Sequence, residues 1–279
     1  MKRTIINFAI VAAAAFAIVS CVQKESTTPV QDETPKYVTF EFMANLPADT
    51  KTENDGMNTY WSENDHIKVI YEGKYTGVHE VSVPFTYAGD NKFVGKLEWE
   101  LAMGFMFGSY STLKAVYPYE TSGAFQPVTV QTGYDSMAHL DGANCPLSGE
   151  ITLDWNQDFN MELLNNYKLN DVTLKHLTSV LEVAVVNNTN YAVEVSDVDF
   201  LVDGEVKATT VVEEAGALAA GESAKVYVVV EPETYAGSQI SFQVNDTFEK
   251  KVTVDGDVTF TAGKIKKVNF VLKSIIYLE

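Results

Sequence analysis

The chain has 279 residues and a net charge of −18 at pH 7, with 38 Asp and Glu against 20 Lys and Arg. Arg3 is its one arginine. Recognition of nucleic acid or phosphate needs clustered basic side chains, so this composition argues against both. The length is sufficient for one large domain or for two β-domains of ordinary size.

The first 20 residues have the pattern of a signal peptide. Lys2 and Arg3 give a positive start, residues 5–19 form an apolar run, and Ser20 is small. The apolar run is short for a transmembrane helix. We therefore expect residues 1–20 to be removed from the mature protein.

Residues 18–21, IVSC, resemble a bacterial lipobox. The resemblance implies cleavage between Ser20 and Cys21 and attachment of diacylglycerol to the Cys21 sulfur. Lys24-Glu25 resembles a tag that sends such lipoproteins to the outer cell surface in some anaerobes. Because the acidic chain argues against electrostatic membrane binding, the lipid would be the main anchor to the outer membrane. Residues 21–36 are polar with two prolines and predict a flexible tether.

Residues 37–46, YVTFEFMANL, predict the first β-strand. Apolar side chains alternate with a mixed set, which places one apolar row on one face of the strand. That row consists of Val38, Phe40, Phe42, Ala44 and Leu46. The loop that follows contains Lys51, and a first strand attached by a cleavable loop is a strand that can be exchanged.

The rest of the chain repeats strand patterns between short turn signals, and no amphipathic helix of three full turns follows the signal peptide. Before an irregular stretch at 136–165, strands are expected at 67–71, 81–87, 92–99, 111–117 and 128–131. After it, strands are expected at 174–187, 193–202, 205–213, 225–231, 239–245, 248–254, 258–261 and 266–272. The pattern predicts an all-β chain of two sandwich domains in tandem, at 37–168 and 169–279.

Residues of catalytic or metal-binding type are present without a recognisable arrangement. No GxSxG, GxGxxG or GKT-type motif occurs, so we expect no enzyme activity and no cofactor. The four histidines lie apart without ligand spacing, and for His176 a hydrogen-bonded structural role is favoured. Asp197, Asp199 and Asp203, or Asp255 with Asp257, are candidates for calcium contacts, but solvated carboxylates are the favoured interpretation.

Three further positions carry open alternatives. Cys145 is the one cysteine after Cys21, which leaves the mature chain without an internal disulfide and favours structural burial of this thiol. Tyr60 and Trp61 suit either a core or an exposed aromatic platform for sugars, with the core favoured. Asp135-Ser136-Met137 resembles the acceptor of a surface O-glycosylation system, which makes Ser136 a candidate glycosylation site.

Several segments together resemble the fimbrillin (type V pilin, Mfa-like) family of Bacteroidales-type bacteria. They are the lipobox, YVTFEFMANL with TKTENDG, YWSENDHIKV at 60–69, AVYPYE at 115–120, LKHLTSVLEVAVVN at 174–187 and FTAGKIKKVNFVL at 260–272. The resemblance implies two transthyretin-like β-sandwich domains and no enzymatic activity. It also implies a structural or adhesive subunit of a surface fimbria that serves cell adhesion.

The resemblance further implies assembly by strand exchange. A trypsin-like protease would cut between Lys51 and Thr52 and release the first strand. The C-terminal segment of a neighbouring subunit would fill the open edge that remains. The candidate donor side chains are Val268, Phe270, Leu272, Ile276 and Leu278. The implied partners are other fimbrial subunits, the protease and an unidentified surface receptor; the alternative is a monomeric glycan-binding surface lipoprotein.

Overall fold

The computed structural model describes residues 37–47, 61–73, 77–80, 84–99, 102, 112–140, 142–152, 167–236, 239–253 and 256–273. Their elements are twenty β-strands and a three-residue 3-10 turn, η2 (Gly142–Asn144). The prediction of an all-β chain is confirmed. Within these residues, none of the helices has the length and apolar character needed to cross a membrane.

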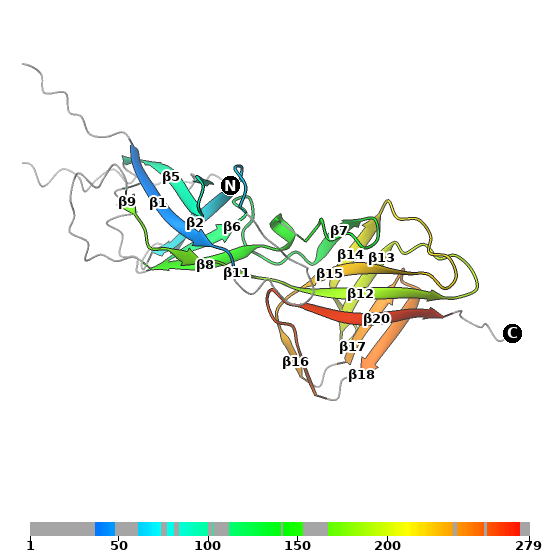
Figure 1. Ribbon diagram of the computed structural model, residues 1–279. Coiled ribbons are helices and arrows are strands. Elements are labelled where there is room, and N and C mark those ends of the chain that lie inside the picture. The colour runs from blue at the N-terminus through cyan, green and yellow to red at the C-terminus, as the bar shows by residue number, and fades with distance from the viewer. Residues whose placement is uncertain are drawn as a thin grey trace, which may run out of the picture. The chain divides into compact units, whose positions relative to one another are not determined.

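The first sheet has ten strands; β1, β5, β2, β6 and β8 are labelled among them in Figure 1. Along its main path the order is β10-β1-β5-β4-β2-β6-β8-β11, with β3 paired to β2 and β9 paired to β1. The strands are β1 (Tyr37–Asn45), β2 (His66–Gly73), β3 (Gly77–Glu80), β4 (Phe85–Tyr87), β5 (Lys92–Glu98), β6 (Thr112–Tyr117), β8 (Leu147–Thr152), β9 (Tyr167–Lys168), β10 (Val172–Thr173) and β11 (Lys175–His176). Alternate side chains of β1 and β5 point into one apolar core, as a period of two requires.

One short segment closes this sheet. β10 pairs in parallel with β1, Ala44 opposite Val172, and two residues later β11 pairs antiparallel with β8, His176 opposite Leu147. Gly149 on β8 makes the closure possible. A Cβ on this residue would lie 2.5 Å from Val172 Cγ2 and 2.8 Å from the Thr173 carbonyl oxygen. Residues 172–176 therefore join both ends of the strand order.

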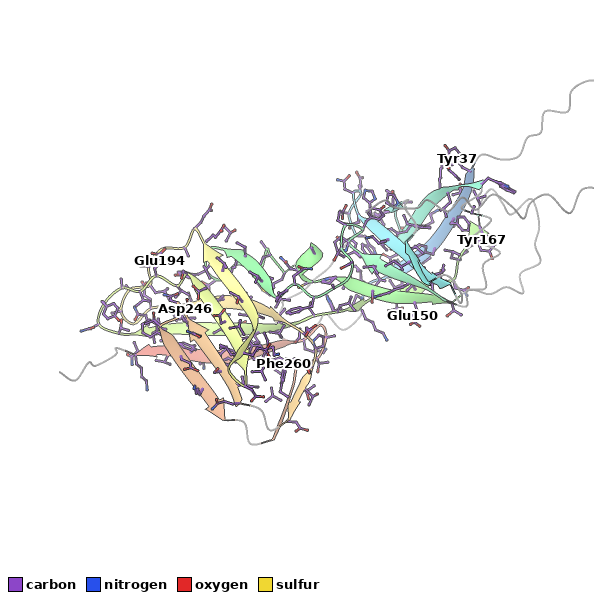
Figure 2. All side chains as sticks on the ribbon, turned by 180° about the vertical axis from the view of Figure 1, so that it is seen from behind. Tyr37, Glu150, Tyr167, Glu194, Asp246 and Phe260 are labelled. Atoms are coloured by element: carbon purple, nitrogen blue, oxygen red, sulfur yellow. The ribbon has the colours of Figure 1, made fainter. Side chains whose placement is uncertain are left out.

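Two further sheets face each other across a second core, in which Phe200 and Phe260 are packed edge to face; Phe260 is labelled in Figure 2. The five-stranded sheet has the order β18 (Phe248–Thr253), β17 (Gln239–Val244), β13 (Asp197–Val202), β14 (Glu205–Glu213) and β7 (Val128–Thr132). The three-stranded sheet has the order β15 (Ser223–Val230), β12 (Ser179–Asn188) and β20 (Ile265–Lys273), and β16 (Thr234–Ala236) pairs with β19 (Asp257–Thr259).

Local turn chemistry explains the tightest hairpin of this sandwich. Asp203 and Gly204 connect β13 to β14 with φ values of 51° and 82°. Two-residue hairpins of type I′ need positive φ at both positions, which Asp and Gly tolerate well. The sequence therefore favours this reversal locally, and the distant Gln239 supports it: its N–H donates to the Asp203 carboxylate, and its carbonyl accepts from the Asp203 N–H, both at 2.8 Å.

The strand pairing does not follow chain order at the expected domain boundary. β7, from before residue 168, pairs in parallel with β14 of the second sandwich. β10 and β11, from after residue 168, pair with β1 and β8 of the first sheet. The division into 37–168 and 169–279 stays a prediction, and the described ladders cross it in both directions.

We expect Gly149→Ala to lower the free energy of unfolding by about 1–3 kcal/mol, because the added methyl overlaps Val172 and the Thr173 backbone. Urea unfolding followed by circular dichroism measures this change. Gly216→Ala is the matched control, since a Cβ there meets nothing within 4 Å. Equal stability of the two variants would show that the contact between Gly149 and residues 172–173 has room for a methyl group.

Candidate functional site

The residues expected to be processed lie outside the described part of the chain. They are Ser20, Cys21, Lys51 and Thr52, together with the candidate donor side chains Ile276 and Leu278. Their roles in signal cleavage, lipidation, proteolysis and strand donation stay predictions. The structure does describe β1 and the strands around it, and these form the candidate functional site.

β1 has a long ladder on one side and two short ladders on the other. Seven residues pair antiparallel with β5, from Tyr37 opposite Glu98 to Met43 opposite Lys92. On the other side β9 and β10 pair in parallel with two residues each. The N–H of Leu169 donates to the Glu41 carbonyl at 2.8 Å, and this bond lies between those two ladders. β1 is therefore inserted between β5 and the segment 167–173.

The inward row of β1 fills the first core. Val38, Phe40, Phe42 and Ala44 are each at most 1% exposed. Phe42 lies with its ring centroid 5.3 Å from that of Phe85 and 6.0 Å from that of Phe93. Phe40 contacts Tyr167 of β9 at 5.6 Å between centroids; Tyr167 is labelled in Figure 2. Leu46, just beyond the strand, is half-buried and packs against the same core.

Trp61 fixes the far end of β1. Its indole N–H donates to the Ala44 carbonyl at 2.9 Å. The ladder to β5 ends at Met43, and beyond it the Ala44 N–H donates to the Asn91 carbonyl at 2.8 Å, in the turn before β5. Trp61 thus supplies a donor where the neighbouring strand has ended.

Trp61 is itself held in place by aromatic and polar contacts. Its ring meets Phe93 and Tyr117 edge to face, at centroid distances of 4.8 and 5.1 Å. The Tyr117 hydroxyl donates to Asp65 Oδ1 at 2.8 Å, and the Ser62 N–H donates to Asp65 Oδ2 at 2.6 Å. Three of the family-like segments, YVTFEFMANL, YWSENDHIKV and AVYPYE, therefore meet at one end of β1.

The site is apolar and has little local charge. An ion pair on β1 joins Lys92 Nζ to Glu41 at 3.9 Å, with both side chains partly exposed. Such a pair contributes little to stability. The half-buried Trp61 also packs into this core, which is the interpretation that the sequence favoured. Tyr60 lies outside the described residues. Among the described residues, hydrophobic burial and main-chain pairing hold β1.

The candidate donor strand is occupied in its own sandwich. β20 pairs in parallel with β12 over nine residues. Phe270 and Leu272 are buried in the second core, and Val268 is half-buried against it. Donation of these three side chains to another subunit therefore requires β20 to leave β12.

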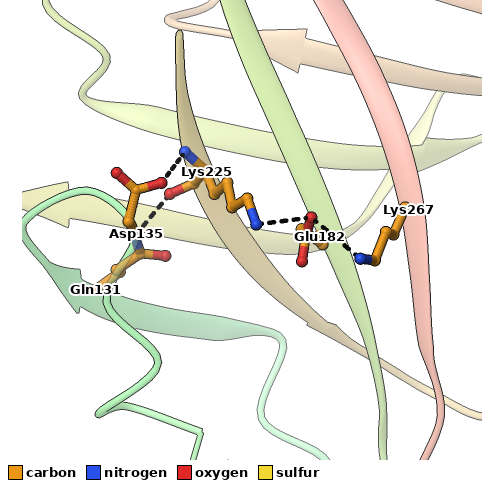
Figure 3. A network of polar contacts seen from close by, with 5 residues as sticks. All are labelled: Gln131, Asp135, Glu182, Lys225 and Lys267. Carbon is orange, nitrogen blue, oxygen red and sulfur yellow. Dashed lines mark hydrogen bonds and ion pairs between the residues drawn. The ribbon is translucent and has the colours of Figure 1, made fainter. Parts of the chain in front are cut away.

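The segment around Ser136 covers an edge of the three-stranded sheet (Figure 3). The Asp135 carboxylate accepts a hydrogen bond from the Lys225 N–H at 3.0 Å, and Gln131 Nε2 donates to the Lys225 carbonyl at 3.1 Å. Lys225 also pairs through its side chain with Glu182 at 3.2 Å. Asp135 thus has a structural role, and the half-buried Ser136 stays a candidate for glycosylation.

His176 lies where β11 leads into β12. Its ring is buried, and neither ring nitrogen has a hydrogen-bond partner among the described residues, which corrects the expectation of a hydrogen-bonded histidine. The ring packs against Gly263, where a Cβ would lie 2.9 Å from His176 Cδ2. Burial lowers the pKa of His176 below its ordinary value of 6.5, because the charged form loses solvation.

The acidic side chains considered for calcium do not form a metal site in the described part of the chain, where no group of three or more His, Cys, Asp or Glu is arranged to hold a metal ion. Burial raises the pKa of Asp199, and the neighbouring Asp197 and Asp246 add to this, while a hydrogen bond from Thr209 opposes it. Asp255 lies outside the described residues. Cys145 is buried beside Val180 and Tyr227.

No protein-family profile matches this chain, and no curated protein matches it. Similar solved structures include a fimbrial protein from Bacteroides ovatus, which is 14% identical with a TM-score of 0.38. That match covers 88% of this chain and 51% of the other, so this chain spans about half the length of that protein.

Two others are the fimbrial anchor protein Mfa2 from Porphyromonas gingivalis and a fimbrial assembly protein from Parabacteroides distasonis. Mfa2 is 12% identical, with a TM-score of 0.35, 77% of this chain covered and 83% of that chain. The assembly protein is 13% identical, with a TM-score of 0.32, 85% of this chain covered and 93% of that chain. Similarities of this size assign the chain to no family.

We expect Phe42→Ala to lower the free energy of unfolding by about 3–5 kcal/mol, because it leaves a cavity against Phe85 and Phe93. Denaturant unfolding measures the loss. Thr39→Ala, on the other face of β1, is the matched control, with an expected loss below about 1 kcal/mol. Similar losses for both variants would contradict a one-sided core contact of β1.

Stability should also fall as the pH drops below about 6.5. In the unfolded chain His176 takes up a proton near pH 6.5, whereas in the folded protein its pKa is lower. The contribution of the neutral His176 ring to stability is therefore fully present above pH 6.5 and is lost as the pH falls toward the lowered pKa. Urea unfolding at pH 7.5 and 5.5 would show a smaller pH dependence for His176→Leu than for the unmodified chain. An unchanged pH dependence would remove His176 as a contributor.

Proposed function

We propose that this chain is a structural or adhesive subunit of a surface fimbria, built from two transthyretin-like β-sandwich domains and anchored through lipid on Cys21. Its localisation is the outer membrane and the fimbrium at the cell surface. The observation that carries the proposal is β1, a strand that fills a core while its chain continues into a segment containing Lys51. Cleavage between Lys51 and Thr52 would separate β1 from the rest of the protein.

Loss of β1 would create a strong acceptor for another strand. The seven-residue ladder of β5 would lose its partner, and the cavity left by the inward row would expose Phe85, Phe93 and Tyr167 to water. Fully burying a Val or Phe side chain is worth about 1.5–3 kcal/mol. Refilling this groove with an extended apolar strand is therefore strongly favourable.

The C-terminal segment of another copy has the matching side-chain series. β1 presents Val38, Phe40, Phe42, Ala44 and Leu46. The C-terminal segment presents, at the same spacing, Val268, Phe270, Leu272, Ser274 and Ile276. If β20 stays in place, only side chains beyond it, including Ile276 and Leu278, are available. Release of β20 from β12 makes the complete series available.

The proposed partners follow from this mechanism. They are other fimbrial subunits, a trypsin-like protease and a receptor on a host or bacterial surface. No nucleic acid and no cofactor takes part. The role is structural, without enzymatic activity.

The test is to treat the full chain with a trypsin-like protease, identify new N-termini by mass spectrometry, and assay SDS-resistant multimers. We expect a start at Thr52 with multimers for the unmodified chain, and neither for Lys51→Ala. Lys36→Ala is the matched control, because cleavage before β1 leaves the strand attached. An intact β1 and no multimers would contradict the proposal, and glycan-array binding lost in Trp61→Ala would then support the glycan-binding alternative.

A further inference from the structure

The hydrogen bond from Trp61 reaches a main-chain atom of β1. Its acceptor is the Ala44 carbonyl, at 2.9 Å. A carbonyl exists at this place in any strand that occupies the groove, whatever its sequence. The contact therefore holds one main-chain carbonyl of any such strand at this point, and the side chain that fits beside it decides which residue provides that carbonyl.

The position that Trp61 contacts also holds the smallest residue of the inward row. Ala44 is 0% exposed, and it lies between the Val172 side of the groove and the turn at Asn91. The preceding inward residues are Phe40 and Phe42, which occupy aromatic surroundings. A large side chain at the Ala44 position would overpack a filled space.

The contacts that orient Trp61 come from outside β1. Phe93 belongs to β5 and Tyr117 to β6, and Asp65 holds the Tyr117 hydroxyl and the Ser62 N–H. None of these contacts needs β1 to be present. Trp61 is thus positioned in advance for an incoming strand.

We propose that Trp61 sets the register of the exchanged strand and selects a strand with a small residue opposite it; this inference rests on the proposed function. The occupant is the segment Val268–Ile276 of a second copy, running antiparallel to β5. Ser274 then takes the place of Ala44, and Phe270 and Leu272 take those of Phe40 and Phe42.

Alternation makes this register unique. A slip by one residue turns the apolar row to the other face. A slip by two keeps the face but brings Leu272 or Ile276 to the Ala44 position beside Trp61. Only the register with Ser274 there avoids a large side chain.

The experiment uses the full chain, folded and then cut between Lys51 and Thr52, so that β1 starts in place. A labelled peptide of residues 37–47 exchanges with the bound strand, and unlabelled peptides compete. We expect Ala44→Leu to weaken competition at least tenfold, while Met43→Leu, at a half-buried position on the other face, has little effect. The peptide of residues 267–277 should compete, and its Ser274→Leu variant should lose this ability.

A backbone ester in place of the amide after Ala44 weakens that carbonyl as an acceptor. The ester also removes the Asn45 N–H on the β10 side, and this loss is the same against both proteins. We therefore expect the ester to reduce competition about fivefold more against the unmodified protein than against Trp61→Phe, which keeps an aromatic ring without the indole N–H. Near-ultraviolet circular dichroism checks that this variant is folded.

The outcomes separate the two proposals. If the unmodified 37–47 peptide does not exchange, the proposed function fails. If it exchanges but Ala44→Leu and the ester compete like the parent peptide, the role of Trp61 is overturned and the proposed function stands. If only the 267–277 peptide fails to compete, the C-terminal segment is not the occupant.

Discussion

The first sheet depends on the double pairing of residues 172–176, which join β1 through β10 and β8 through β11. Together with β9, this segment covers the side of β1 that β5 does not reach. The ladders there are short, with two paired residues at β9 and two at β10, and the N–H groups of Leu169 and Leu174 donate to the carbonyls of Glu41 and Asn45. β1 is therefore buried through its side chains, with one long ladder along its main chain and two short ones.

Other strand edges in the described part of the chain carry protection. The outer edge of β15 is satisfied by the Gln131 side chain, which accepts from the Tyr227 N–H at 2.8 Å and donates to the Lys225 carbonyl. At β20, Lys250 donates to the Asn269 carbonyl at 2.7 Å. Natural sheets use such polar cover and edge lysines to prevent unwanted pairing. β1 is held differently, by an apolar row and by the hydrogen bond from Trp61.

The contacts around Trp61 bring together three segments that are far apart in the sequence. The Tyr117 hydroxyl donates to Asp65, and the Tyr117 ring packs against Trp61 and orients it. Trp61 in turn donates to the Ala44 carbonyl of β1. These polar and aromatic contacts fix the position of Trp61, and Trp61 holds the end of β1. His176, by contrast, has no hydrogen-bond partner for its ring in the described part of the chain, where the ring packs against Gly263.

The sequence by itself determined the strand content, the inward row of β1 and the Asp203-Gly204 reversal, because period-two burial and turn chemistry are local properties. It also favoured a core position for Trp61. Only the tertiary structure decided that β7 pairs with β14, that residues 172–176 close the first sheet around Gly149, and that Trp61 bonds to a main-chain carbonyl. These contacts join residues far apart in the chain. Because every residue has a main-chain carbonyl, the sequence of a strand does not indicate which carbonyl accepts a hydrogen bond.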